Sequence, residues 1–145
     1  MTTTINAFIK LVPASLKQTI TTEELKELFY YYKDITAKTG KQLGWDYEHH
    51  AFPYDLKDVE EGKGRWFYLK SDMDRYNLIV ISISQEKIKE YEEERIQSYI
   101  QISLTGDSTH GDKAKANEFC KFLSKQLQGE LHLFNNRIMY YYKRR

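Results

Sequence analysis

The chain has 145 residues and a net charge of +1, with 41% hydrophobic and 30% charged residues. This balance is typical of a globular protein and excludes a disordered chain, and the near-neutral total gives no overall attraction to nucleic acid or an anionic membrane. The single cysteine excludes an internal disulfide. No apolar stretch reaches the ~18 residues that span a membrane, and the N-terminus lacks a secretory signal pattern. We therefore expect one cytoplasmic domain over residues 1–145, without membrane contact.

The N-terminal part of the chain predicts a strand followed by a helix. Residues 5–12 alternate between apolar and polar side chains, which indicates a half-buried strand that ends at Pro13. Thr21 and Glu24 have the spacing of a helix capping box, and Gly40 stands where a helix commonly ends. Apolar residues recur at helical spacing between these positions, so we expect the first helix there.

The middle of the chain predicts mainly strands. Residues 42–50 favour a short strand, and residues 51–64 favour a charged loop that contains glycine. Residues 66–70 and 76–84 indicate two paired strands joined by a turn. Residues 85–94 are a run of charges, for which we expect a helical turn or a mobile connector.

The C-terminal part repeats the order of strand, helix and strands. Residues 96–104 predict a long strand with one apolar face, and the loop TGDSTHGD at residues 105–112 leads into a second helix ended by Gly129. The tail predicts a hairpin with its turn at Asn135 and Asn136, because asparagine tolerates positive φ.

This order of elements defines the expected fold class. It predicts an α+β fold with a mainly antiparallel sheet of about six to seven strands and two helices packed on one face. Each half begins with a strand and a helix that are followed by further strands, which suggests a possible β-α-β-β pseudo-repeat.

Two helices on one face leave the other face of the sheet without a helical cover. An uncovered face that mixes aromatic and amide side chains favours a contact with a protein partner or a second copy of the chain. The alternative is that these aromatic residues close the rim of the core or lie under the loop at residues 51–64. The predicted partner-binding residues are Trp66, Tyr68, Gln97, Tyr99 and Gln101.

The loop before the second helix is the best candidate for a small ligand. Free N–H groups at a helix N-terminus favour anions, and glycines, hydroxyls and a lysine surround this one. Asp107 and Asp112 would repel a phosphate, and Asp112 or Thr109 could simply cap the helix. The predicted anion-binding residues are Gly106, Ser108, Thr109, Gly111 and Lys113.

The other chemical signals are weaker. Asp46, Glu48 and His50 would share one strand face, but three such residues without a fourth ligand are a poor metal site, and we expect no metal and no cofactor. Cys120 lies on the apolar stripe of the second helix, where an inert thiol is expected. No nucleophile elbow, zinc motif or phosphate loop is present, so the sequence favours a non-catalytic protein and names no catalytic residue.

One stretch of the sequence resembles a known family. The segment INAFIKLVPASLKQTITTEELKELFYYYKDITAKTGKQLGWDYEHHAFPY, residues 5–54, is similar to a small family of uncharacterised cytoplasmic proteins from spore-forming Gram-positive bacteria, classed as a domain of unknown function. The resemblance implies a single α+β domain and a bacillus-like source. It implies no activity, substrate or catalytic residue.

Three functions follow from the sequence, in order. The first is a non-catalytic domain that binds a protein partner or itself through the helix-free sheet face. The second is a small-ligand or anion-binding module, or an enzyme, that uses residues 105–113. The third is weak binding of nucleic acid through the aromatic and basic tail at residues 140–145, against which the near-neutral total charge argues.

Overall fold

The structure is a computed structural model that describes residues 4–43 and 52–143. These residues form one antiparallel sheet of seven strands, in the order β2-β3-β4-β5-β1-β6-β7, together with two α-helices and one 3₁₀ helix. Along the chain, the elements are β1 (Ile5–Lys10), α1 (Thr22–Leu43), β2 (Asp55–Lys57), η1 (Glu60–Gly62), β3 (Trp66–Lys70), β4 (Leu78–Glu90), β5 (Glu93–Leu104), α3 (His110–Leu127), β6 (Glu130–His132) and β7 (Ile138–Tyr140). This arrangement confirms the predicted α+β class and the antiparallel sheet.

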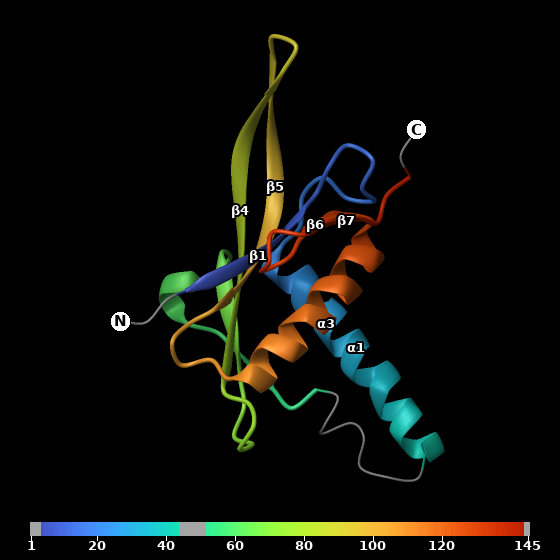
Figure 1. Cartoon of the computed structure of the whole chain (residues 1–145), viewed down its shortest axis with the longest axis vertical. Helices are drawn as coiled ribbons and strands as arrows, with labels where there is room; N and C mark the ends of the chain where they lie inside the picture. The colour runs from blue at the N-terminus through green and yellow to red at the C-terminus, as the bar shows by residue number, and fades with distance from the viewer. Residues whose placement is uncertain (1–3, 44–51, 144–145) are drawn as a thin grey trace.

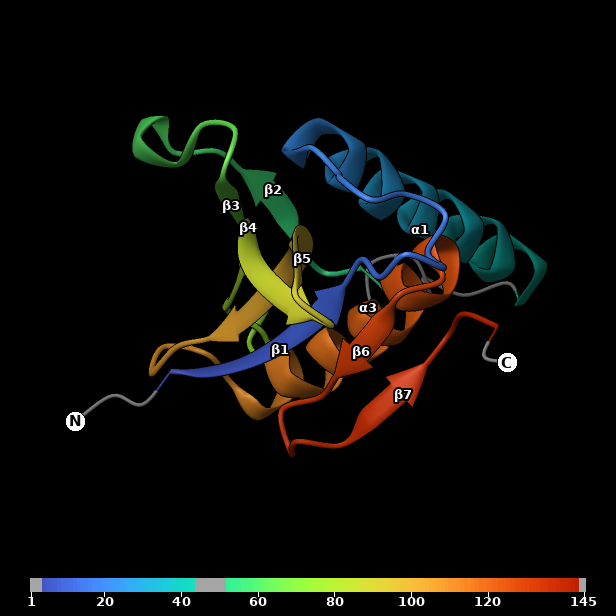
Figure 2. The same cartoon turned by 90° about the horizontal axis from the view of Figure 1, so that it is seen from above.

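Both α-helices lie on the same side of the sheet (Figures 1 and 2). Helix α3 packs directly on the central strands, and α1 packs beside it through ring contacts of Phe29 with Phe119 and with Phe67 of β3. Phe29, Phe67 and Phe119 are fully buried in this layer. The helix side of the sheet therefore holds the hydrophobic core, as the alternation of the strands predicts.

The start of α1 follows the prediction, but its end does not. The N–H of Thr21 donates to Glu24 over 3.1 Å, and the N–H of Glu24 donates to the hydroxyl of Thr21 over 3.1 Å, which completes the capping box. The helix continues past Gly40 to Leu43. A glycine inside a helix costs about 1 kcal/mol relative to alanine but does not force an end, so the expected stop at Gly40 was wrong.

Two segments that were predicted as irregular are ordered. The expected loop at residues 51–64 contains the short strand β2 and the turn η1, and the expected connector at residues 85–94 is the end of a long β4–β5 hairpin. Figure 1 shows this hairpin projecting well beyond the rest of the molecule. The prediction of a connector at residues 85–94 was wrong because a strand exposed on both faces shows no alternation of apolar and polar residues.

The second helix and the tail agree closely with the sequence. Helix α3 buries its predicted stripe and ends at Leu127, and Gln128 takes the left-handed conformation with φ 53°. Gly129 comes next. A Cβ at this position would lie 2.9 Å from Cγ2 of Ile9, so a larger residue would crowd that side chain. Strands β6 and β7 form the predicted hairpin, and Asn136 has the expected positive φ of 69°.

Strand register fixes which residues face away from the helices. Ile79 and Ile81 of β4 are buried against the core, so Leu78 and Val80 point to the opposite side. This settles a choice that the sequence left open, because both alternating sets on this strand are apolar. The first half of the chain places three strands after its helix and the second half places two, so the pseudo-repeat holds in element order only in part.

Candidate functional site

The candidate site is the side of the sheet that faces away from α1 and α3, which we call the helix-free face. Among the described residues no helix lies on it (Figure 2). Cross-strand pairing brings its side chains into rows. One row contains Trp66, Ser82, Gln101, Phe8 and His132, which lie opposite one another on β3, β4, β5, β1 and β6.

The aromatic residues of this face are half-buried. Trp66, Tyr68 and Tyr99 all belong to it, as predicted, and the ring of Tyr99 packs edge-on against Phe8 with centroids 5.7 Å apart. Part of the Trp66 indole is covered, because a side chain at Gly62 would collide with it. The segment at Gly62 therefore shields one part of the Trp66 ring, as the alternative interpretation expected, and partner binding by the other rings stays a prediction.

The two predicted amides lie on the same face but are already engaged. Gln97 is only 4% exposed, and its amide N–H donates to Oε1 of Glu86 over 3.0 Å. The amide of Gln101 donates to Oδ1 of Asn6 over 3.1 Å and to the hydroxyl of Ser103 over 3.2 Å. These glutamines shape the floor of the face and offer little free amide to a partner.

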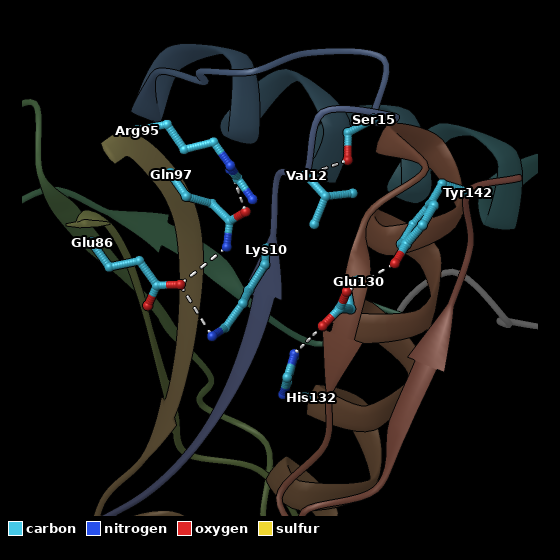
Figure 3. A network of polar contacts seen from close by, with 9 residues as sticks. All are labelled: Lys10, Val12, Ser15, Glu86, Arg95, Gln97, Glu130, His132 and Tyr142. Carbon is cyan, nitrogen blue, oxygen red and sulfur yellow. Dashed lines mark hydrogen bonds and ion pairs between the residues drawn. The ribbon is translucent and has the colours of Figure 1, made fainter. Parts of the chain in front are cut away.

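A polar network crosses the upper part of the helix-free face, at the base of the projecting hairpin (Figure 3). Lys10 forms an ion pair with Glu86 over 3.1 Å, and Gln97 accepts a hydrogen bond of 2.8 Å from Arg95. Arg95 also lies 3.5 Å from Glu90. Its Nε–H is buried and has no acceptor among the described residues, so the guanidinium retains an unused donor.

The neighbouring strand pair β6–β7 supplies the second half of the network. Glu130 lies 2.8 Å from Nε2 of His132 through one carboxylate oxygen and accepts a hydrogen bond of 3.0 Å from the hydroxyl of Tyr142 through the other. Figure 3 shows these side chains facing Lys10 and Gln97 across the surface. A carboxylate held at both oxygens is fixed in place, which preorganises this side of the site.

Two hollows lie between these groups and meet at Lys10. One has a volume of about 380 Å³ and is lined by the aromatic pair Phe8 and Tyr99, with His132. The other has a volume of about 420 Å³ and is bounded by Pro13 and the base of the projecting hairpin. We call the two together the face groove. Side chains of both charges and apolar rings line it, which suits a polypeptide surface better than a single charged small molecule.

Sequence reasoning missed most of the charged residues of the face groove. Lys10 was placed on the outer side of its strand but was given no role, and Glu86, Arg95 and Glu130 were not singled out. Alternation along each strand could have identified them, because these residues occupy positions that point to the same face of the sheet as the predicted glutamines and tyrosines. For Glu86 and Arg95 that signal was lost because their segment was not recognised as strand.

The predicted anion-binding loop has a different organisation. Asp112 is fully buried and accepts hydrogen bonds from the hydroxyl of Tyr54 at 2.5 Å and from the N–H groups of Asn77, Leu78 and Thr109 at 2.8–3.1 Å. The hydroxyl of Thr109 accepts from the Asp112 N–H over 3.0 Å, which completes a capping box. A carboxylate of the protein thus already neutralises the start of α3.

The other predicted residues of that loop also turn toward the protein. Ser108 donates to the carbonyl of Leu78 over 2.7 Å, and Thr109 donates to the carbonyl of Arg75 over 2.6 Å. Gly111 packs against that same carbonyl, with which a Cβ would overlap, so close packing explains this glycine. Gly106 and Lys113 are exposed. These contacts favour the capped loop that the sequence offered as the alternative, and anion binding stays a prediction.

The phenol of Tyr54 and the thiol of Cys120 are buried near the helices and have raised pKa values. Burial raises the pKa of Tyr54, and the hydrogen bond to Asp112 raises it further. Burial also raises the pKa of the Cys120 thiol to about 12, so little thiolate forms near neutral pH. These groups serve packing and hydrogen bonding.

Two predicted features fall on residues that the structure does not describe. The candidate metal set Asp46, Glu48 and His50 and the predicted strand around it lie in the segment 44–51, outside the described residues, although Gln42 and Leu43 belong to α1. The tail is described to Lys143, where Tyr140 and Tyr142 lie edge to face with centroids 5.8 Å apart on the helix-free side. Within the described ranges, no helix is long and apolar enough to cross a membrane.

Fold and face together define a two-layer α+β protein in which an antiparallel sheet carries both helices on one side. The chain belongs to the family described as a domain of unknown function, DUF1885, whose model matches residues 5–143. It is similar to a solved structure titled "Crystal Structure of Protein of Unknown Function from Bacillus stearothermophilus", with 42% identity and a TM-score of 0.51. That match covers 86% of this chain and 91% of the other. No curated protein matches the chain.

Proposed function

We propose that this protein is a non-catalytic binding domain that contacts another polypeptide chain through its helix-free face. The observation that carries the proposal is that hydrogen bonds and ion pairs hold the polar side chains of that face in place, while one donor among them has no acceptor. The half-buried rings of Phe8 and Tyr99 line the face groove, and the buried Nε–H of Arg95 beside it lacks an acceptor among the described residues. The Nε–H itself is enclosed, so a partner would contact the exposed third of the Arg95 side chain together with the rings beside it.

Aromatic and arginine side chains provide most of the energy in protein interfaces, and they do so best around a groove. The helix-free face combines both residue types with Glu86 and Glu130, which would fix the orientation of the partner. The cytoplasmic location and an origin in spore-forming Gram-positive bacteria belong to the same proposal. The structural relative from Bacillus stearothermophilus supports the origin.

A comparison of variants tests the proposal. The double variant Phe8→Ala with Tyr99→Ala removes the ring pair of the face groove, whereas Tyr30→Ala removes an exposed ring on α1 and serves as the matched control. The tagged chain is incubated with lysate of a spore-forming bacterium, and retained proteins are identified by mass spectrometry. We expect a partner that Tyr30→Ala retains and the double variant loses. Equal retention by all three proteins would contradict the proposal.

A further inference from the structure

The β4–β5 hairpin extends beyond the body of the protein (Figure 1). We call residues 85–97 the hairpin arm. The arm begins where the neighbouring strands stop pairing with the hairpin. On the β4 side, the last residue pair with β3 is Ser82 with Trp66. On the β5 side, the last backbone hydrogen bond runs from the Leu11 N–H to the Ser98 carbonyl over 2.9 Å. Beyond these points, no described strand pairs with the arm. An isolated two-stranded ribbon is marginally stable in water, so a long projecting one indicates a contact outside the monomer.

The tip of the arm has an unusual sequence for its conformation. Tyr91 and Glu92 form the two-residue turn with φ values of 51° and 72°. Such turns favour Asn-Gly, and a bulky residue at positive φ is an outlier. Tyr91 is 98% exposed and makes no ring contact or hydrogen bond with the described residues. Neither turn chemistry nor packing accounts for this ring, and unfavourable conformations of this kind are retained mainly at functional positions.

The charge of the tip adds a second feature. Glu92, Glu93 and Glu94 are exposed, and within the described ranges none forms an ion pair. Glu90 differs, since it lies near Arg95. Like charges gathered at the end of a ribbon repel one another, and a cationic surface would relieve that repulsion. The tip therefore offers one aromatic ring beside three carboxylates that form no ion pair in the described part of the chain, although Lys89 lies opposite Glu94 in the ladder.

The complementary surface occurs on the same chain. Lys113, Lys121 and Lys125 are exposed on α3; Lys121 and Lys125 are one turn apart, and Lys113 lies about 80° around the helix axis from Lys121. We call them the lysine stripe, which spans about 18 Å at the helical rise per residue. None of the three forms an ion pair in the described part of the chain, whereas Lys115 pairs with Glu118 over 3.2 Å.

We propose that two copies of this chain associate with the arm tip of each lying on the lysine stripe of the other. Within one molecule the arm projects away from α3, so the tip does not reach its own stripe (Figure 1). The arm reaches about 20 Å from Gln85 to Tyr91, close to the length of the stripe. Reciprocal contacts of one pair of surfaces close a two-fold dimer. These surfaces are separate from the face groove, so this proposal does not rest on the proposed function.

Charge reversal with rescue tests the dimer by sedimentation equilibrium of the full chain. Reversal of the tip (Glu92→Lys, Glu93→Lys, Glu94→Lys) or of the stripe (Lys113→Glu, Lys121→Glu, Lys125→Glu) should weaken association by roughly tenfold or more. The two reversals combined should restore it. Raising NaCl from about 50 to about 500 mM should weaken wild-type association, because salt screens exposed charges.

A second variant separates association from folding. Tyr91→Asn with Glu92→Gly installs the residues that the turn favours, so its midpoint of urea unfolding should be unchanged or higher than that of the wild type. Its association should nevertheless be weaker, because the ring and one carboxylate are removed. Lys33→Glu and Tyr30→Ala on the surface of α1 are the controls, and both should associate like the wild type.

Several results would overturn the dimer. One is a wild-type chain that stays monomeric at its highest soluble concentration, and another is an association that neither reversal weakens. Binding of duplex DNA or RNA by the stripe without any self-association would also contradict the proposal. Loss of association in Tyr99→Ala but not in the charge reversals would assign self-association to the helix-free face and reject the arm.

Discussion

The two faces of the sheet use the same strands for different purposes. On the helix side, residues such as Phe67, Ile81 and Ile102 are apolar and fully sealed by α1 and α3. On the helix-free side, the alternate residues mix aromatic, charged, amide and hydroxyl side chains with the apolar Leu78 and Val80, and most stay partly exposed. Folding requires the first pattern because it builds the core. It does not require the network around Lys10 and Glu130, which points to a role outside folding.

Removal of a core ring should have the largest effect on stability. Phe119 of α3 is fully buried and contacts the rings of Phe29 and Tyr54. Phe119→Ala should lower the free energy of unfolding by about 3–5 kcal/mol, through lost burial and the cavity left behind. Urea unfolding measures this, with the exposed Tyr30→Ala as control, for which we expect a change within about 0.5 kcal/mol. Equal losses in both variants would contradict the assignment of the core to the helix side.

Loss of the buried carboxylate should have the next largest effect. Asp112→Ala removes the acceptor of the Tyr54 hydroxyl and of several backbone N–H groups, so the free energy of unfolding should fall by about 3 kcal/mol. Asp107→Ala, an exposed position in the same loop, should change it by less than about 0.5 kcal/mol. Thermal or urea unfolding distinguishes the two. If the two variants are equally stable, the capped-loop interpretation is wrong and anion binding at the loop gains support.

Alkaline pH should have a smaller effect on the free energy of unfolding, and one that is specific to Tyr54. The pKa of Tyr54 is raised above the ordinary value of 10.0 by burial first and by the Asp112 hydrogen bond second. The neutral phenol therefore stabilises the fold below about pH 10, and this contribution is lost as the pH rises above that value. Tyr54→Phe should lower the free energy of unfolding by about 1 kcal/mol at neutral pH.

The same variant should lose stability less steeply than the wild type above pH 10, because it lacks the phenol that must ionise on unfolding. Urea midpoints measured across this range for both proteins check the difference. Tyr141 and Cys120 also have raised pKa values, so part of the alkaline decline remains in the variant. Parallel declines in the two proteins would show that Tyr54 titrates as it does in the unfolded chain.

The helix-free face should respond less in stability than the core. Tyr99 is half-buried and packs on Phe8, so Tyr99→Ala should cost about 1–2 kcal/mol in the free energy of unfolding. That is smaller than the expected loss for Phe119→Ala, although an aromatic ring is removed in each case. A loss as large as the one at Phe119 would show that both faces belong to the core. A small loss combined with lost partner binding would sharpen the contrast between them.

The fold was largely predictable because hydrophobic periodicity and helix capping are local properties of the sequence. Thr21 with Glu24 marked the start of α1, and alternation marked β1 and β3. The sequence did not predict the continuation of α1 past Gly40 or the projecting hairpin. Tertiary contacts override a single helical glycine, and an arm exposed on both faces carries no hydrophobic period.

The candidate site was predictable only in its aromatic half. Opposition to the buried residues placed Trp66, Tyr68 and Tyr99 on the helix-free face. The charged half depends on which strands are neighbours, since Lys10 meets Glu86 only because β1 lies beside β5. Strand order is a long-range property that alternation does not encode, whereas the partners of Glu130 lie on its own strand and just beyond the other strand of the predicted hairpin.

Photo-crosslinking inside the cell is the most direct test of the binding role of the helix-free face. A photoreactive phenylalanine analogue replaces Tyr99 in one strain and Tyr30, on the surface of α1, in another. Binding through the sheet face predicts a discrete crosslinked partner at position 99 and none at position 30. Crosslinks that are absent at 99, or equal at both positions, would contradict it.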